Sequence, residues 1–290
     1  MTSNDCLGFL GLGVMGLPMA QHLAQQHPLV VFNRTREKAE ALAGSDIEVA
    51  QTPAEVAARC RLIFCMLAND EAVSHVMRGP AGVFQSDLRD RIIVDHSTIS
   101  PRLTRTLAAE AGQRGAVWLD APVTGGDIGA REGTLTMMVG GPREAFEVVL
   151  PYLREMGRLI VHVGPVGQGQ MLKLVANLVS ALNLMAASEG VRMALDLGLG
   201  LDEAALVMQN GSAQSFELTK VLDRVRRKDF TPGFSVAHRY KDLKLALDLA
   251  REARFPADLA WSAERLYREH LARGYGAQDE SSYWTRWDEG

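Results

Sequence analysis

A glycine-rich segment near the N-terminus constrains the fold of this chain more than any other feature. It is Gly11-Leu12-Gly13-Val14-Met15-Gly16, which fits the pattern G-x-G-x-x-G between an apolar run and a helical pattern. Such glycines allow a tight turn and let the backbone approach a pyrophosphate at the N-terminus of the following helix. A turn without a ligand is the alternative. The strand–turn–helix context and the second apolar run that follows favour a dinucleotide-binding unit.

The first half of the chain alternates short apolar runs with helical patterns. Strands separated by helices predict βαβ units in a mostly parallel sheet, and burial on both faces explains why the runs are continuously apolar. The predicted strands are 6–10, 29–32, 62–67, 91–95, 117–119, 134–139 and 159–163, and the predicted helices are 15–26, 36–43, 101–113 and 144–153.

The second half shows only helical patterns, over 170–197, 202–209, 216–227, 235–254 and 256–273. The change predicts an α/β, Rossmann-type N-terminal domain with a mostly parallel sheet, followed by an all-α C-terminal domain joined by a long interdomain helix. We expect residues 1–163 to bind the dinucleotide, and residues 164–290 to serve the substrate and oligomerisation.

Composition excludes several classes of protein. The chain has 31 Lys and Arg against 35 Asp and Glu, a net charge of −4, so nucleic acid is not an expected partner. Cys6, Cys60 and Cys65 have no metal-ligand spacing, and no metal is expected. The polar start 1–5 does not resemble a signal peptide, and no uninterrupted apolar stretch reaches membrane-spanning length. We therefore expect a cytoplasmic protein without a membrane partner.

The residues after the second strand bear on the choice of cofactor. An acidic residue there would bind the 2′-hydroxyl of NAD, but this chain has Asn33-Arg34-Thr35 and no carboxylate before Glu37. Arg34 can bind a 2′-phosphate through charge-assisted hydrogen bonds, or it can be a solvated surface residue. The segment favours NADP, with NAD as the alternative cofactor.

Two later segments have candidate binding and proton-transfer residues. Thr124-Gly125-Gly126 can expose backbone N–H groups to a carboxylate, or it can be a connecting loop. Lys173 and Asn177 share one face of the long predicted helix. Lys173 either extends its amine to water or sits in a cleft with a lowered pKa, ready to exchange a proton. Glycines just before the helix favour the second interpretation, because they allow a ligand to approach closely.

The segment Lys241-Asp242-Leu243 is, taken alone, typical of an amphipathic helix with a solvated charged face.

Together these motifs resemble the β-hydroxyacid dehydrogenase family, which includes 3-hydroxyisobutyrate dehydrogenases and glyoxylate/succinic semialdehyde reductases. The resemblance covers nearly the whole chain, in the family's order and spacing. It also includes the segments Cys65-Met66-Leu67, Asp95-His96-Ser97-Thr98 and Gly274-x-Gly276-x-x-Asp279. The segment 33–35 is similar to the NADP-preferring reductase branch.

The resemblance implies roles for particular residues. Lys173 would be the general acid/base and Asn177 would orient the reacting oxygen or the lysine. Thr124, Gly125 and Gly126 would hold the substrate carboxylate; threonine replaces the family's more frequent serine at Thr124, which affects substrate shape more than mechanism. Cofactor contacts are implied at the turn 11–16, at 33–35, and at Met66, Leu67, Thr98 and Lys241, with Lys241 also reaching substrate.

The expected reaction is hydride transfer between NADP and a small β-hydroxy acid or its aldehyde acid, by a homodimer or homotetramer. Two alternatives stay open. Imine reductases share the architecture but generally lack a lysine at the position of Lys173, and a cofactor-binding module would bind NADPH without turnover.

Overall fold

The chain divides into two compact units, Met1–Lys173 and Leu174–Gly290. The computed structural model describes residues 6–44, 46–231 and 233–288, so the polar start at 1–5 lies outside the described residues. The longest helix, α8 (Gln168–Asp196), begins before this division. The boundary predicted after residue 163 and the division after residue 173 therefore lie on either side of its first turn.

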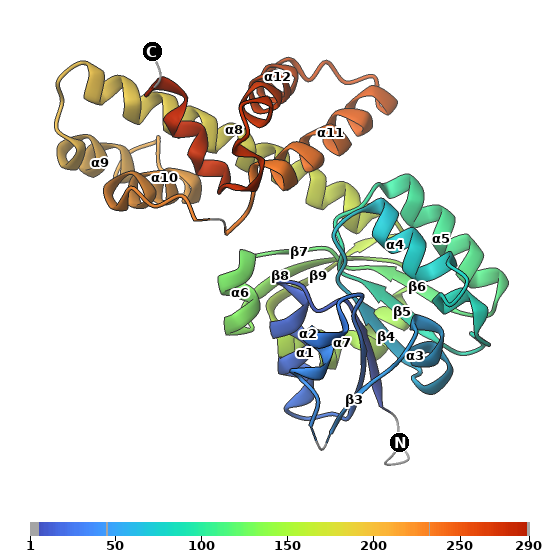
Figure 1. The fold of residues 1–290 in the computed structure, drawn as a ribbon. Helices are drawn as coiled ribbons and strands as arrows, with labels where there is room; N and C mark the ends of the chain where they lie inside the picture. The colour runs from blue at the N-terminus through green and yellow to red at the C-terminus, as the bar shows by residue number, and fades with distance from the viewer. Residues whose placement is uncertain (1–5, 45, 232, 289–290) are drawn as a thin grey trace. The chain divides into compact units, whose positions relative to one another are not determined.

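The N-terminal unit is built on one sheet with the strand order β3-β2-β1-β4-β5-β6-β8-β7, and β9 pairs with β8 (Figure 1). The neighbours from β3 to β6 are parallel, whereas β8 is antiparallel to β6 and β7. The order 3-2-1-4-5-6 is that of a dinucleotide-binding doubly wound sheet. The strands are β1 (Leu7–Leu10), β2 (Leu29–Phe32), β3 (Ile47–Val49), β4 (Leu62–Cys65), β5 (Ile92–Asp95), β6 (Val117–Asp120), β7 (Val123–Thr124), β8 (Leu135–Gly140) and β9 (Gly157–Gly164).

Helices cover both faces of this sheet. One core cluster joins alternate strand residues to α1 (Gly16–Ala24) and α7 (Arg143–Met156). The other joins the intervening residues to α3 (Pro53–Arg59), α4 (Asp70–Arg78) and α5 (Pro101–Gln113). Short helices α2 (Arg36–Glu40) and α6 (Gly126–Glu132) and the 3-10 turn η1 (Val83–Gln85) complete the unit.

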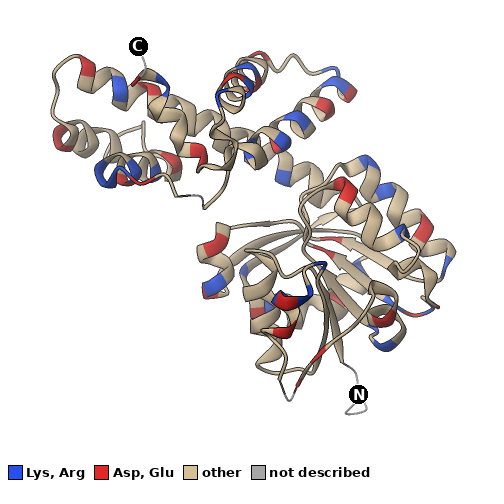
Figure 2. Ribbon diagram, in the orientation of Figure 1, with Lys and Arg blue, Asp and Glu red and all other residues tan. Residues whose placement is uncertain are grey.

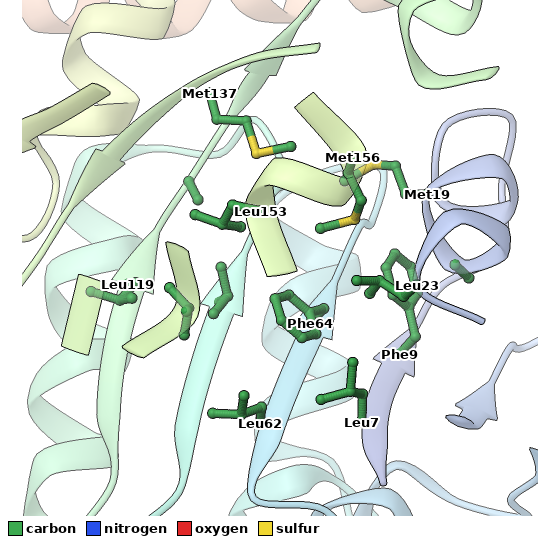
Figure 3. Close-up of a cluster of buried hydrophobic side chains, with 14 of the residues drawn as sticks. Leu7, Phe9, Met19, Leu23, Leu62, Phe64, Leu119, Met137, Leu153 and Met156 are labelled. Carbon is green, nitrogen blue, oxygen red and sulfur yellow. The ribbon is translucent and has the colours of Figure 1, made fainter. Parts of the chain in front are cut away.

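Alternation along β4 shows why the predicted strands are continuously apolar. Leu62 and Phe64 point into the first cluster (Figure 3), whereas Ile63 and Cys65 belong to the second. Because both sets of side chains are buried, a period-2 pattern of polar residues is absent from this strand. Charged residues accordingly gather on helices and loops, and the strands are mostly free of them (Figure 2).

Among its described residues, the C-terminal unit consists of helices joined by turns and loops, with no named strand. Its core packs the buried face of α8 against residues of the later helices, with Tyr267 and Tyr283 among its largest fully buried side chains. The predicted all-α character is confirmed. The helices after α8 are α9 (Leu201–Gln209), α10 (Phe216–Arg227), α11 (Val236–Glu252) and α12 (Asp258–Ala272), followed by 3-10 turns η2 (Tyr275–Ala277) and η3 (Glu280–Trp287).

By length and composition alone, α8 could cross a membrane, the one such helix found among the described residues. This is weak evidence, because core helices of soluble proteins pass the same test. Ala181 and Leu184 on α8 are fully buried in the helical core.

Candidate functional site

The turn between β1 and α1 requires glycine at two positions and leaves room at a third. Gly11 has φ +97°, and a Cβ atom there would lie 2.4 Å from the Met66 carbonyl oxygen. A Cβ at Gly16 would lie 2.0 Å from the Gly11 carbonyl oxygen, so α1 packs directly on the turn. At Gly13 a Cβ would meet no described atom within 4 Å apart from its chain neighbours. The open side of the turn is therefore at Gly13, where a pyrophosphate could approach the backbone.

Asn33 ties this turn to the end of β2. The Leu12 N–H donates to Asn33 Oδ1 at 2.9 Å, and Asn33 Nδ2 donates to the Thr35 carbonyl oxygen at 2.7 Å. The amide thus holds two segments that the sequence predicts to contact cofactor.

The two arginines after β2 differ in their surroundings. Arg36 donates to Glu40 Oε1 and to Gln51 Oε1, both at 2.7 Å. Arg34 is exposed, and its guanidinium takes part in no ion pair within the described part of the chain. Arg34 is therefore the arginine available to an added anion.

The carboxyl ends of β4 and β5 are joined by side chains. The Leu67 N–H donates to Ser97 Oγ at 2.9 Å, and the Ser97 N–H donates to Asp95 Oδ1 at 3.0 Å. Met66, Leu67 and Thr98 are half-buried beside these contacts. The structure thus brings three predicted cofactor residues to one edge of the sheet.

The segment Thr124-Gly125-Gly126 forms an exposed turn between β7 and α6. Gly125 has φ +129° and Gly126 has φ +64°, conformations that favour glycine. A Cβ at Gly126 would meet no described atom within 4 Å beyond its chain neighbours. The turn is open to solvent at the position predicted to hold a carboxylate.

The first turns of α8 hold Lys173 and Asn177, each only 7% exposed. Just before them, the glycines make close approaches to protein atoms. A Cβ at Gly169 would lie 2.3 Å from the Met138 carbonyl oxygen and 2.8 Å from the Asp120 carbonyl oxygen. The small residue at Gly169 thus lets α8 pack on the sheet, so the room that we attributed to a ligand is filled by the protein there.

In the C-terminal unit, Asp242 contacts both Asn177 and Lys241, two of the predicted site residues. Asn177 Nδ2 donates to Asp242 Oδ2 at 2.6 Å, and Lys241 Nζ lies 3.3 Å from Asp242 Oδ1. Arg239 Nη1 donates to the Asn177 carbonyl oxygen at 2.9 Å. Residues of α11 therefore bind Asn177 both at its side-chain amide and at its backbone carbonyl.

The predicted residues thus fall into groups within each unit. The turn 11–16, Asn33 and the ends of β4 and β5 share the carboxyl edge of the sheet, and the turn 124–126 follows β7. Lys173 is the last residue of the first unit, and Asn177 follows one helical turn later in the second.

Comparison with known proteins agrees with the fold described above. A model of the NAD-binding domain of 6-phosphogluconate dehydrogenase matches residues 6–164, and one described as NAD-binding of NADP-dependent 3-hydroxyisobutyrate dehydrogenase matches residues 167–286. A 2-(hydroxymethyl)glutarate dehydrogenase of Eubacterium barkeri is 33% identical, covering 100% of this chain and 97% of the relative. The chain belongs to the β-hydroxyacid dehydrogenase family.

Two further proteins of this family extend the comparison. The 2-hydroxy-3-oxopropionate reductase of Escherichia coli K12 is 36% identical, covering 95% of this chain and 94% of the relative. The structure of Mycobacterium tuberculosis 3-hydroxyisobutyrate dehydrogenase with L-serine superimposes with a TM-score of 0.88 at 30% identity, covering 97% of this chain and 98% of that one. This β-hydroxyacid dehydrogenase is accordingly an oxidoreductase that uses NAD(P).

Asp242 and Gln170 carry contacts in this β-hydroxyacid dehydrogenase that the sequence did not reveal. A signal was present for the first, because Val236, Leu243 and Ala246 form the buried stripe of α11, and Asp242 lies within it. A carboxylate in an apolar stripe needs a partner, here the Asn177 amide.

Among the described residues, no group of three or more His, Cys, Asp or Glu could hold a metal ion.

Burial shifts the pKa values of two adjacent groups at the end of β5. Loss of hydration raises the pKa of Asp95 to about 6, although hydrogen bonds from Ser97 and Cys65 favour its charged form. The same loss lowers the pKa of His96 to about 4, and His96 Nδ1 donates to the Ala121 carbonyl oxygen at 2.8 Å. The folded state therefore favours the uncharged form of both.

These shifts predict opposing effects on stability between about pH 4 and pH 6.5. Asp95 binds its proton more tightly when folded, so its contribution to the unfolding free energy falls as pH rises through about 6. His96 resists protonation when folded, so its contribution falls as pH drops from 6.5 through about 4. On acidification across this range, the unfolding free energy of Asp95→Asn should fall by up to about 3 kcal/mol relative to that of wild type. The unfolding free energy of His96→Gln should rise relative to wild type by a similar amount. Urea unfolding at both ends of this range measures the difference, and equal slopes in all three proteins would contradict it.

Proposed function

We propose that this protein transfers a hydride between NADP(H) and a small β-hydroxy acid or the corresponding aldehyde acid, with Lys173 as general acid/base. The observation that carries the proposal is the pair on α8: Lys173 and Asn177 are both nearly buried, one helical turn apart, and the Asn177 amide is fixed by Asp242. A nearly buried lysine, one helical turn from an oriented amide, is suited to proton exchange.

The residues of the N-terminal unit fit a nicotinamide dinucleotide. Gly13 leaves the backbone of the turn open, and Gly11 and Gly16 hold that turn against β4 and α1. We assign the pyrophosphate to this turn, and the nicotinamide half to Met66, Leu67 and Thr98 at the carboxyl ends of β4 and β5. When bound, the cofactor supplies or accepts the hydride at its nicotinamide ring.

Preference for NADP over NAD rests on Arg34. No carboxylate follows β2 at 33–35 to repel a 2′-phosphate, and Arg36 is already bound to Glu40 and Gln51. Exposed Arg34 can turn its guanidinium to the phosphate in a bidentate contact. The description of the second family model, which names an NADP-dependent enzyme, supports the same preference.

Arg34→Gln should raise KM for NADPH by about 10- to 100-fold, because a charge-assisted contact contributes about 1.5–3 kcal/mol. KM for NADH should change less than about threefold. Arg36→Gln is the matched control, because Arg36 is the neighbouring arginine with partners of its own. Parallel changes in both KM values for Arg34→Gln would show that this residue does not discriminate between the cofactors.

The proton pathway follows from the chain's own residues. In oxidation, neutral Lys173 would take the hydroxyl proton at Nζ as the carbon bearing that hydroxyl gives up a hydride. In reduction, the Lys173 ammonium returns the proton to the carbonyl oxygen as carbon gains the hydride. Asn177, with Nδ2 held by Asp242, keeps Oδ1 available to accept a hydrogen bond from the reacting hydroxyl or the lysine.

We assign substrate binding to the turn Thr124-Gly125-Gly126 and to Lys241. The exposed turn offers backbone N–H groups and the Thr124 hydroxyl to a carboxylate. Lys241 adds a positive charge that can contact cofactor or substrate. The substrates named for the relatives support this class, because 3-hydroxyisobutyrate and 2-(hydroxymethyl)glutarate are β-hydroxy acids and 2-hydroxy-3-oxopropionate is an aldehyde acid.

A substrate panel with both NADPH and NADH tests the proposed function. Small β-hydroxy acids and aldehyde acids should be turned over with NADP(H) preferred, and the panel should include cyclic imines. Preferential reduction of imines would favour an imine reductase. Tight NADPH binding without oxidation across the whole panel would favour a binding module.

Assembly as a homodimer or homotetramer remains a proposal. Val175, Val179 and Met193 lie on one exposed side of α8, which offers apolar side chains for pairing with a second copy of this helix. Light scattering of the purified protein measures the assembly directly.

A further inference from the structure

The side chain of Gln170 is fully buried in the N-terminal unit and fills both its hydrogen-bonding roles. Gln170 Nε2 donates to the Ser97 carbonyl oxygen at 2.7 Å, and Gln170 Oε1 accepts from the Ile99 N–H at 3.2 Å. These two backbone groups flank Thr98. One amide therefore fixes the backbone on both sides of Thr98, just beyond the carboxyl end of β5.

A second fastening holds the main chain of the same helical turn. The Gln170 N–H donates to Asp120 Oδ2 at 2.9 Å, and the Gly167 N–H donates to Asp120 Oδ1 at 2.7 Å. Asp120 is the last residue of β6, the strand beside β5. The start of α8 is thus bound to the ends of two neighbouring parallel strands.

The edge to which α8 is bound is the one where this fold binds ligands. In a doubly wound sheet, a dinucleotide lies outside the carboxyl ends of the strands, and the half that contains β4, β5 and β6 receives its second nucleotide. Ser97 also accepts a hydrogen bond from the Leu67 N–H, so the end of β4 belongs to the same network. Lys173 lies three residues after Gln170 on α8, on nearly the same face.

We propose that Gln170 is a positioning residue that couples the cofactor-binding segment 97–99 to the first turn of α8 and so sets where Lys173 presents its amine. The inference rests on the proposed function for the role of Lys173. The mechanical link from Gln170 to segment 97–99 is independent of that role.

The chemistry of the link requires an amide. It needs one acceptor for the Ile99 N–H and one donor for the Ser97 carbonyl oxygen, 2.7 Å from Nε2. A glutamate would face that carbonyl with a second acceptor and would introduce a fully buried negative charge. A methionine has similar length and neither group, so Gln170→Met removes both bonds with little change in volume.

Hydrogen–deuterium exchange with and without NADP⁺ tests the link without turnover. In wild type, NADP⁺ should slow exchange in segment 97–99 and in segment 168–173. In Gln170→Met, the slowing at 97–99 should remain while that at 168–173 is lost. Gln168→Met is the matched control, because Gln168 is exposed in the same helical turn. The inference would be overturned if NADP⁺ did not slow exchange in segment 168–173 of the wild type. It would also be overturned if NADP⁺ still slowed exchange in that segment of Gln170→Met.

Kinetics then test the consequence for catalysis. Gln170→Met should lower kcat by about 10- to 100-fold, because small misplacement of reacting groups has effects of that size. NADPH affinity should stay within about threefold, and the isotope effect from 4-deuterated NADPH should rise as hydride transfer becomes rate-limiting. A merely structural role would reduce the active fraction and leave that isotope effect unchanged, which would overturn the positioning role.

Two provisions keep the outcomes separate. If Gln170→Met does not fold, Gln170→Asn keeps the amide but shortens its reach by one methylene, and the same pattern is expected. If the wild-type protein turns over no acid on the panel, the proposed function fails. The exchange experiment requires only NADP⁺ binding and still decides whether Gln170 couples the two segments.

Discussion

Lys173→Ala should lower kcat by about 10²- to 10⁴-fold, the usual contribution of a positioned general acid or base. The amine would be lost from a nearly buried position on α8, so water would be poorly placed to replace it. The affinity for NADPH, measured by fluorescence titration, should stay within about threefold, because the turn 11–16 and Arg34 are unchanged. Added methylamine should restore part of the rate if the missing function is proton exchange.

Two further variants identify the property of Lys173 that matters. Lys173→Arg keeps the positive charge but cannot release a proton near neutral pH, so it should be nearly as slow as Lys173→Ala. Lys244→Ala removes an exposed lysine from α11 and should have wild-type kinetics. A fall in kcat of less than about tenfold for Lys173→Ala, with NADPH binding intact, would refute the assignment of Lys173 as general acid/base.

The sheet could be predicted from the sequence because its strands are buried on both faces. Runs such as 29–32 are apolar at every position, and β2 has those bounds in the structure. Two of the elements that were missed, α6 and β7, have weak local patterns. Helix α6 starts at Gly126, a poor helix former, and β7 has only two residues. Helix α3 was missed although Thr52 accepts a hydrogen bond from the Glu55 N–H and Pro53 follows it, a recognisable start signal.

The same distinction applies to the candidate site. The spacing of Lys173 and Asn177 indicates that they share a helix face, and the pattern at 11–16 indicates a turn, because both are local features. The partners that hold these residues are distant in the chain. Asp242 is 65 residues from Asn177, and Ser97 is 73 residues from Gln170. Such pairings depend on how the helices and strands pack, which no spacing within one segment encodes.

A pair of glycine substitutions separates the turn's role in the fold from its role in binding. Gly16→Ala would place a Cβ 2.0 Å from the Gly11 carbonyl oxygen, so α1 or the turn must shift. Such overpacking costs about 1–3 kcal/mol, and Tm should fall by about 2–10 °C even without cofactor. Gly13→Ala would place its Cβ in open space, and the Tm of the cofactor-free protein should stay within about 1 °C of wild type.

For NADP⁺ binding, unlike for stability, we expect a large effect of the Gly13→Ala substitution. Its added methyl group would lie where the backbone must approach the pyrophosphate, so the Kd for NADP⁺ should rise by about 10- to 100-fold, which isothermal titration calorimetry can measure. Gly16→Ala should also bind NADP⁺ less tightly, because its turn is distorted. In that variant, however, the weaker binding comes together with the fall in Tm described above. Wild-type affinity in Gly13→Ala would mean that the phosphates do not approach this turn. Because Gly13→Ala leaves the packing of the unliganded turn unchanged, a loss of NADP⁺ affinity in this variant could not be attributed to misfolding.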